Sequence, residues 1–331
     1  MTDSSEPSTL TAKLGERDAP AISVIVAMED DREYATAVLE GFLDQTVEPE
    51  RFELLVVSWQ GGRSFAAAID RLRTQPRAPE VTYLRCPTRS RAAKNNLGIA
   101  HASAPILCFC GDDFVPCASY IEAHLDYHET HPESTRVAIG PGLSPESMRC
   151  EAPFIAWLED SGELFGARFR DPELSLPTTF FYVANSSIKR SLFERAGSFD
   201  ERLPFPACDD SEYGHRLASL GMVAELVPRA SCIHDHRFTL EDRLISTGWA
   251  GASHAILTTG EPNALRRARQ GAALHLAPLR EWCHSIPREG PRVARWRWKL
   301  ASAYLSGYRR QIRKARANRS VTELGSGAGP G

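Results

Sequence analysis

The sequence of 331 residues lacks several features that mark special classes of protein. It has no run of 18 or more apolar residues, the length that a membrane-spanning helix requires. Its 23 glycines and 22 prolines are close to average usage, which excludes collagen-like and wholly disordered chains. The chain begins with polar and acidic residues, where a secretory signal carries basic and then apolar residues. We therefore expect a cytoplasmic protein with a packed hydrophobic core.

The eight cysteines are scattered, and in a cytoplasmic protein most are expected to be reduced and buried. Cys108, Cys110 and Cys117 lie closest together and raise the question of a zinc site. The first two fall inside an apolar run, and structural zinc sites usually separate paired ligands by two to four residues. This spacing favours buried thiols over a zinc site.

Charge is distributed unevenly along the chain. From Glu261 onward there are 15 Lys and Arg against 4 Asp and Glu, whereas the preceding 260 residues have 24 basic and 38 acidic residues. An acidic body and a basic C-terminal segment indicate either a contact with an anionic surface or docking of the segment on its own body. The acidic body and the lack of a recognisable nucleic-acid-binding module argue against nucleic acid as a partner.

The basic segment also carries an apolar stripe with helical spacing. Its residues recur at steps of three or four: Val293, Trp296, Leu300, Tyr304, Tyr308 and Ile312. Trp298 and Leu305 fall outside the stripe. The stripe either packs on the body, leaving the arginines solvated, or lies on an anionic membrane as a peripheral amphipathic helix.

Strand-like and helix-like segments alternate over the first 130 residues. Short apolar runs predict strands at 22–28, 53–57, 81–84 and 105–110. Segments with helical spacing lie between them at 32–45, 63–74 and 90–102. The alternation predicts an α/β fold with a mostly parallel, Rossmann-like sheet flanked by helices. Further along we expect strands at 179–184, 222–227 and 230–233 and a helix at 239–257.

These segments predict four regions. They are a disordered leader over residues 1–20, an α/β domain over 21–258, a basic helical extension over 259–319 and a flexible tail over 320–331.

Polar side chains directly follow several of the predicted strands. In an open α/β sheet, ligands bind at the carboxyl ends of the strands, which is where these side chains lie. Their residues are Glu29 and Asp30 after the first strand, Ser58 and Trp59 after the second, and Asp112 and Asp113 after the strand at 105–110. Asp209 and Asp210 begin a later helix, and His234 and His236 follow the last predicted strand. Carboxylates and imidazoles suit a divalent metal, and the carboxylates suit Mg²⁺ or Mn²⁺ in particular.

Each cluster also has a structural explanation. Asp is a common helix N-cap and turn residue, which would account for both aspartate pairs. His234 and His236 would then be core histidines, and Trp59 would cover the end of the sheet instead of stacking on a nucleotide base.

In their order and spacing, six segments resemble glycosyltransferase family 2, whose members have the GT-A fold and use nucleotide-sugar donors with inversion. The resemblance covers roughly residues 21 to 257. Its segments are Ile22–Gln45, Arg51–Gly61, Arg91–Ala100, Ile106–Pro116, the stretches Val183–Phe199 and Asp209–Leu217 taken together, and Val227–His236.

The resemblance implies a role for each candidate residue. Asp113 would bind a divalent metal, Mg²⁺ or Mn²⁺, together with His234 and His236. Asp210, beside Asp209, would be the general base that takes the proton of the acceptor hydroxyl. The remaining implied contacts are with the nucleotide-sugar donor for Glu29, Asp30, Ser58, Trp59, Asn95 and Asp112, and with the acceptor for Asn185 and Ser186.

The chain departs from the family pattern at the nucleotide side. Ser58-Trp59 replaces an acid, Gly111 replaces the first acid of the D-x-D element, and Asp209 replaces the usual Glu. Ala27 to Asp30 replaces a Pro-Thr-x-Asn element, although Glu29 or Asp30 would supply a substitute carboxylate. The resemblance therefore implies a hexosyltransferase-like enzyme, with two alternatives: a non-catalytic GT-A module, or the same fold with another transfer chemistry.

Overall fold

The computed structural model describes residues 19–29, 34–59, 63–164, 169, 175–259 and 288–317. Almost all of the predicted leader, the whole predicted tail and Asp30 lie outside the described residues. The predicted basic extension is described at residue 259 and over 288–317.

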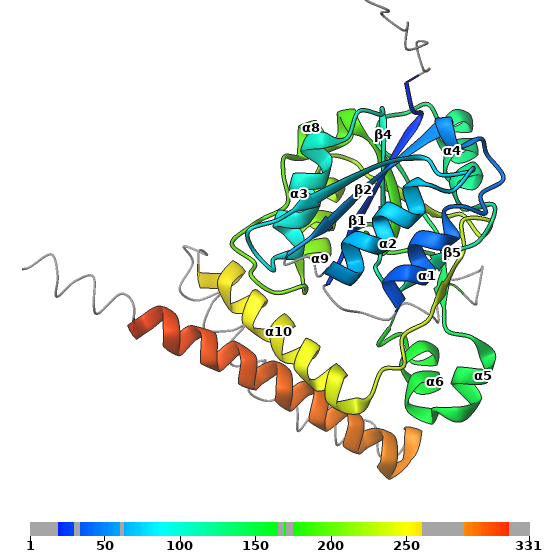
Figure 1. Ribbon diagram of the computed structural model, residues 1–331. Helices are drawn as coiled ribbons and strands as arrows, with labels where there is room; N and C mark the ends of the chain where they lie inside the picture. The colour runs from blue at the N-terminus through cyan, green and yellow to red at the C-terminus, as the bar shows by residue number, and fades with distance from the viewer. Residues whose placement is uncertain are drawn as a thin grey trace, which may run out of the picture.

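A seven-stranded sheet in the order β3-β2-β1-β4-β8-β6-β9 forms the centre of the protein (Figure 1). Its strands are β1 (Ile22–Ala27), β2 (Phe52–Ser58), β3 (Glu80–Arg85), β4 (Ile106–Cys110), β6 (Arg136–Ile139), β8 (Asn185–Lys189) and β9 (Val223–Leu226). The first four strands pair in parallel, as do β6 and β9, whereas β8 runs antiparallel to both of its neighbours. The predicted mostly parallel sheet is confirmed.

The central strands are apolar because helices cover both faces of the sheet (Figure 1). The first three are α1 (Tyr34–Gly41), α2 (Arg63–Arg73) and α3 (Arg91–His101). Helix α3 approaches β1 so closely that a Cβ atom on Gly98 would lie 2.7 Å from a methyl carbon of Ile25. This close packing fixes the start of α3, which carries charged residues, beside the end of the sheet.

A small second sheet brings distant segments together at that end. It contains β5 (Phe114–Pro116), β10 (Cys232–His234) and β7 (Gly142–Leu143), with β10 in the centre. In the antiparallel pairing of β10 with β5, His234 lies opposite Phe114. This register places the end of β10 next to the acidic residues that follow β4.

The predicted strand at 179–184 is wrong, because these residues form turns and irregular backbone, and the strand begins at Asn185. The polar sequence of β8 does not look like a buried strand. Its polar groups are satisfied inside the protein by His124 of α4 (Tyr120–Thr130), whose ring nitrogens lie 3.0 Å from Asn185 Oδ1 and 2.9 Å from Ser187 Oγ. Buried hydrogen bonds thus replace the apolar pattern on which the prediction depended.

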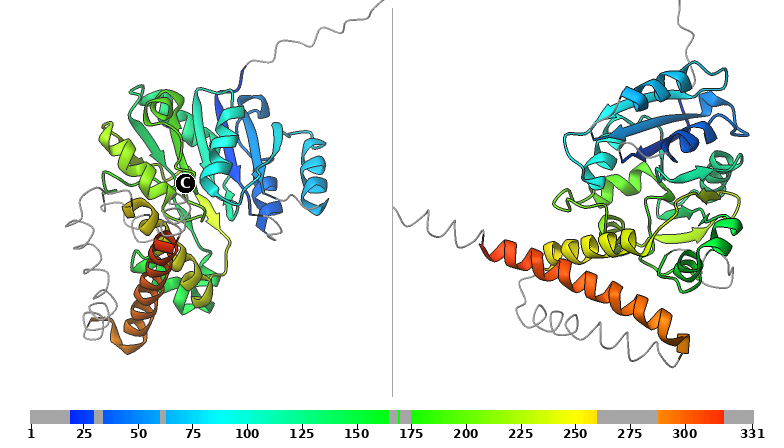
Figure 2. Two further views of the ribbon diagram at one scale, coloured as in Figure 1. Left: turned by 90° about the vertical axis from the view of Figure 1, so that its left-hand side faces the viewer. Right: turned by 60° about the horizontal axis from the view of Figure 1, so that its bottom comes forward.

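The remaining helices complete the layers and form an arm. They are η1 (Pro49–Arg51), α5 (Glu146–Glu151), α6 (Pro153–Asp160), α8 (Arg190–Ala196), α9 (Asp209–Ser219), α10 (Leu240–Thr259) and a helix over 288–317. We call α10 and the 288–317 helix the helical arm, because the two lie side by side below the sheet (Figures 1 and 2). Their backbones touch: a Cβ atom on Gly251 would lie 1.9 Å from the carbonyl oxygen of Tyr304.

The apolar stripe of the last helix packs on the body, as one of the two alternatives predicted. The Trp296 ring lies 5.1 Å from that of Phe154 and 5.3 Å from that of Trp157, measured between ring centroids. Leu300 is buried, whereas Trp298, outside the stripe, is 44% exposed. Among the described residues, no helix is both long and apolar enough to cross a membrane.

Candidate active site

A cavity of about 660 Å³ opens where β1, β4 and β10 end. Its wall combines these strand ends with the start of α9, one side of α10 and two residues of the 288–317 helix. Asp113, Asp210 and His234, which are far apart in the sequence, all line it. The fold therefore brings carboxylates, basic side chains and imidazoles to one space at the carboxyl ends of parallel strands, where ligands of such sheets bind.

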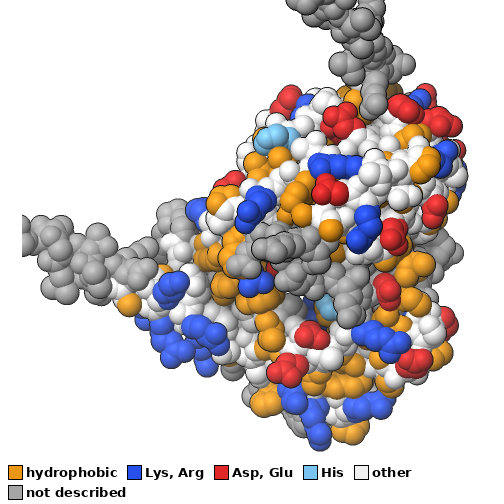
Figure 3. Space-filling model, viewed as in Figure 1, with side chains coloured by type: hydrophobic (Ala, Val, Ile, Leu, Met, Phe, Trp, Pro, Cys, Tyr) orange, Lys and Arg blue, Asp and Glu red, His pale blue; other side chains and the backbone are white. Residues whose placement is uncertain are grey.

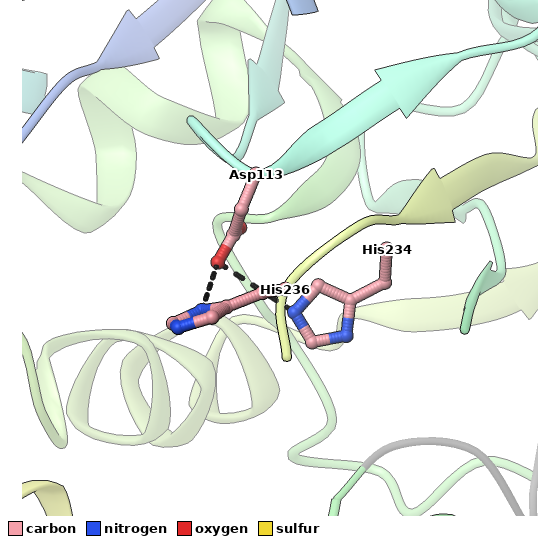
Figure 4. A group of neighbouring side chains, drawn as sticks. All are labelled: Asp113, His234 and His236. Carbon is pink, nitrogen blue, oxygen red and sulfur yellow. Dashed lines mark hydrogen bonds and ion pairs between the residues drawn. The ribbon is translucent and has the colours of Figure 1, made fainter. Parts of the chain in front are cut away.

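Three side chains in this cavity form a candidate metal site. Asp113 Oδ2 lies 3.1 Å from His236 Nδ1 and 3.6 Å from His234 Nε2, and the three side chains point toward one another (Figure 4). One ligand atom from each lies within 4.8 Å of the others. Burial acts to raise the pKa of Asp113, but the two imidazoles outweigh it and lower the pKa, so the carboxyl is ionised. One carboxylate and two imidazoles fit a divalent cation, and the nitrogen donors favour a transition metal such as Mn²⁺ over Mg²⁺.

Two aspartates at the start of α9 have different surroundings. Arg91 Nε and one terminal nitrogen donate hydrogen bonds of 2.8 and 2.6 Å to the two oxygens of Asp209, which is fully buried. The same terminal nitrogen lies 3.4 Å from Asp210 Oδ2. Burial raises the pKa of Asp210 and the charge of Asp209 adds to the rise, against the lowering effect of Arg91. Asp210 is therefore more basic than an ordinary aspartate, whereas Asp209 is fixed by its two hydrogen bonds with Arg91.

The residues near β1 predicted to contact the donor form a separate hydrogen-bond network. The backbone N–H of Glu29 donates to Asp112 Oδ2 over 2.7 Å, and Glu29 Oε1 accepts a 2.8 Å hydrogen bond from Lys94 Nζ. Both acids line the cavity, as does Asn95. The Nδ2 atom of Asn95 is buried and has no hydrogen-bond partner among the described residues, so it remains available to a ligand.

Besides Asp209, which is buried beside Arg91, four of the described candidate residues do not line this cavity. Ser58 is buried and shares a 2.7 Å hydrogen bond with the hydroxyl of Tyr83, and the ring of Trp59 lies under the guanidinium of Arg89. Asn185 donates to the carbonyl of Ala230 and Ser186 to that of Tyr182, with both side chains fully buried in the sheet. The described wall of the cavity includes none of the four.

Sequence reasoning missed the basic residues of the site. Arg91 and Lys94 stand one turn apart in α3, which begins after the N-cap Ser90. Arg243 lies in the first turns of α10 and Tyr304 in the last helix, and both line the cavity. A basic residue on a helix is ordinarily solvated, so only its position beside a strand end distinguishes Arg91 from the other arginines of the chain.

The sheet, the acid that follows β4 and the cavity at the strand ends together define a GT-A glycosyltransferase fold. A solved structure supports this: a mannosyltransferase, PcManGT, from Pyrobaculum calidifontis in complex with GDP-Man and Mn²⁺ has a TM-score of 0.58 at 16% identity, covering 89% of this chain and 87% of that one. The family model described as Glycosyl transferase family 2 matches residues 23–197. The chain belongs to glycosyltransferase family 2, as the sequence predicted.

One curated relative adds a comparison at the level of sequence. Validoxylamine A glucosyltransferase of Streptomyces hygroscopicus subsp. limoneus is 25% identical over an alignment of 228 residues that covers 61% of this chain and 49% of that protein. The chain thus spans about half the length of this relative. The segment that the family model matches ends at residue 197, before Asp210, His234 and the helical arm.

Proposed function

We propose that the protein is an inverting, metal-assisted glycosyltransferase that moves a sugar from a nucleotide-diphosphate donor to a hydroxyl acceptor. One observation carries the proposal: the candidate metal site and Asp210 line the same cavity. Family membership and the nucleotide-sugar complex of the structural relative support the class of donor. The catalytic unit extends over residues 21–258, and the 288–317 helix belongs to a basic extension over 259–319.

The residues divide the chemistry between them. A divalent cation held by Asp113, His234 and His236 would offset the charge that develops on the departing nucleotide diphosphate. Asp210 accepts the proton of the acceptor hydroxyl, because its elevated pKa makes it a better base than an ordinary carboxylate. Arg91 holds Asp209 and so fixes the start of α9 on which Asp210 stands. An acceptor activated on the face opposite the leaving group inverts the anomeric carbon.

The proposed metal site explains why residue 111 is a glycine and not the acid usual in the family. A Cβ atom at Gly111 would lie 2.9 Å from the Phe114 ring and 3.2 Å from Asp113 Oδ1, so an acidic side chain there would crowd the metal ligand. Glu29 and Asp112 supply carboxylates to the same side of the cavity. We propose that these two residues, with Asn95, contact the donor in place of the usual acids.

A thermal-shift screen tests the proposal. Melting temperatures of the full chain are measured with a panel of nucleotide sugars, each with and without Mn²⁺. We expect at least one nucleotide sugar to raise the melting temperature, and only when Mn²⁺ is present, because the diphosphate binds through the cation. A panel in which no compound shifts the melting temperature would contradict the proposal and favour a non-catalytic module.

We also propose that the protein is cytoplasmic and contacts anionic membranes peripherally. Because the apolar stripe is packed on the body, this contact rests on charge alone. The exposed basic residues of the arm, which include those gathered at its outer end in Figure 3, are Arg288, Arg292, Arg295, Arg309, Arg310, Arg313, Lys314 and Arg316.

Cosedimentation with vesicles measures this contact. We expect the protein to bind vesicles that contain phosphatidylserine and to dissociate at high salt, because salt screens the attraction between its basic residues and the anionic headgroups. The double substitution Arg309→Gln and Arg310→Gln should weaken binding, because it removes two of the positive charges. Equal binding to neutral phosphatidylcholine vesicles, or no binding at low salt, would refute it.

A further inference from the structure

The side of α10 that faces the cavity is polar. Arg243, Ser246, Thr247 and Ala250 recur at helical spacing and line the cavity, and Trp249 stands beside them. Leu300 and Tyr304 of the 288–317 helix extend the same wall. All of these residues lie outside the segment that the family model matches, so the family alone does not say what they bind.

Arg243 carries a charge that the described protein does not balance with an ion pair. One terminal nitrogen donates to the backbone carbonyl of Glu163, whereas the carboxylate of Glu163 is paired with Arg297 at 2.5 Å. The Nε atom of Arg243 is buried and has no hydrogen-bond partner among the described residues. Burial lowers the pKa of Arg243 and the charge of Glu163 opposes this, but a guanidinium stays protonated at neutral pH. A partly desolvated cation without an ion pair is costly unless a ligand supplies the anion.

The polar side of α10 is also next to the residues that the proposed reaction uses. Cys208, two residues before Asp210, donates from its Sγ to the carbonyl of Ala250 over 3.6 Å. The ring of Phe205 is stacked on that of Trp249, with 6.0 Å between centroids and 7° between planes. The N-terminus of α10 lies a few residues after His236, and Trp249 and Ala250 lie near the middle of the helix. The first half of the helix therefore runs from the candidate metal site to the start of α9, along the space that the substrates would occupy.

We infer that Arg243 binds an anionic group, a phosphate or carboxylate, of a substrate held in this cavity. The inference rests on the proposed function for the identity of the substrates. A guanidinium gives two parallel hydrogen bonds to such groups, and Nε and the second terminal nitrogen of Arg243 are the donors that remain. The anion belongs either to the diphosphate of the donor or to an acidic acceptor sugar.

Calorimetric titration of the full chain tests the inference with three probes: pyrophosphate, GDP-mannose with Mn²⁺, and glucuronate in the presence of GDP and Mn²⁺. Arg243→Gln is compared with wild type, with Arg243→Lys as the conservative variant. Arg195→Gln on α8 is the control, because Arg195 is exposed and lies outside the cavity lining. We expect Arg243→Gln to weaken at least one probe roughly 10- to 100-fold, Arg243→Lys to restore part of the loss, and Arg195→Gln to have no effect.

The probes separate the two sources of the anion. A loss for pyrophosphate and GDP-mannose assigns Arg243 to the donor, and a loss for glucuronate alone assigns it to the acceptor. Unchanged affinity of a correctly folded Arg243→Gln for every probe that wild type binds, or binding of none of them by wild type, would overturn the inference. If nucleotide sugars fail to bind wild type but pyrophosphate binds through Arg243, the proposed function fails while the anion site stands.

Discussion

Replacing Asp210 with Asn is expected to lower kcat of sugar transfer roughly 10²- to 10⁴-fold, the usual contribution of a general base. Asparagine keeps the size of the side chain but cannot accept the proton of the acceptor hydroxyl. The affinity for the nucleotide sugar should change little, because the proposed function assigns donor binding to the candidate metal site and not to Asp210. Initial rates of transfer measure the effect on kcat, and calorimetry on the same preparations measures the affinity for the donor.

A matched control stands on the same helix. Glu212 forms an ion pair with Arg216 and does not line the cavity, so Glu212→Gln should leave kcat unchanged. In wild type, kcat should fall as the pH drops through the pKa of Asp210, and this acid limb should lie above the usual range for Asp because burial raises that pKa. An Asp210→Asn enzyme with wild-type kcat would exclude Asp210 as the base.

The second substitution with a large expected effect removes the carboxylate of the candidate metal site. Asp113→Asn is expected to weaken Mn²⁺ binding at least roughly 100-fold, because even the loss of an outer-shell partner of a metal site costs 10- to 100-fold. Two imidazoles alone would remain, without the ionised group that attracts the cation. Donor binding in the presence of Mn²⁺ should then fall to the level that wild type shows with a chelator. Titration of Mn²⁺ into each protein measures the first effect directly.

Asp112→Asn is the control for this experiment. Asp112 is the sequence neighbour of Asp113, but its Oδ2 accepts from the backbone N–H of Glu29 and it is not part of the candidate metal site. We expect this variant to alter donor affinity and to bind Mn²⁺ as wild type does. Wild-type Mn²⁺ affinity in Asp113→Asn would mean that the cation binds elsewhere.

Much of the fold could be predicted because its signals are local. The apolar runs that became β1, β2 and β4 are buried on both faces of a parallel sheet, and such strands need no polar alternation. The strand at β8 could not be predicted, because Asn185 and Ser187 depend on His124, which is more than sixty residues away in the sequence. A local pattern carries no information about a partner that distant.

The site residues also divide into those with a local sequence signal and those that depend on distant partners. Asp113, His234 and Asp210 could be proposed because polar residues at strand and helix ends stand out against apolar runs, and the order of the motifs linked them. The pairing of Arg91 with Asp209 spans 118 residues and has no local signature. The apolar stripe left open whether the last helix packs on the body or lies on an anionic membrane. It did not predict that Leu300 and Tyr304 would complete the wall of the cavity.

The proposed function depends most on where the cation and the diphosphate bind. Crystals of the full chain grown with Mn²⁺ and a nucleoside diphosphate, measured at the manganese absorption edge, would locate the ion by its anomalous signal. We expect one peak within bonding distance of Asp113, His234, His236 and a diphosphate oxygen, in the cavity that Asp210 also lines. A peak at another place, or a diphosphate bound away from these three side chains, would contradict it.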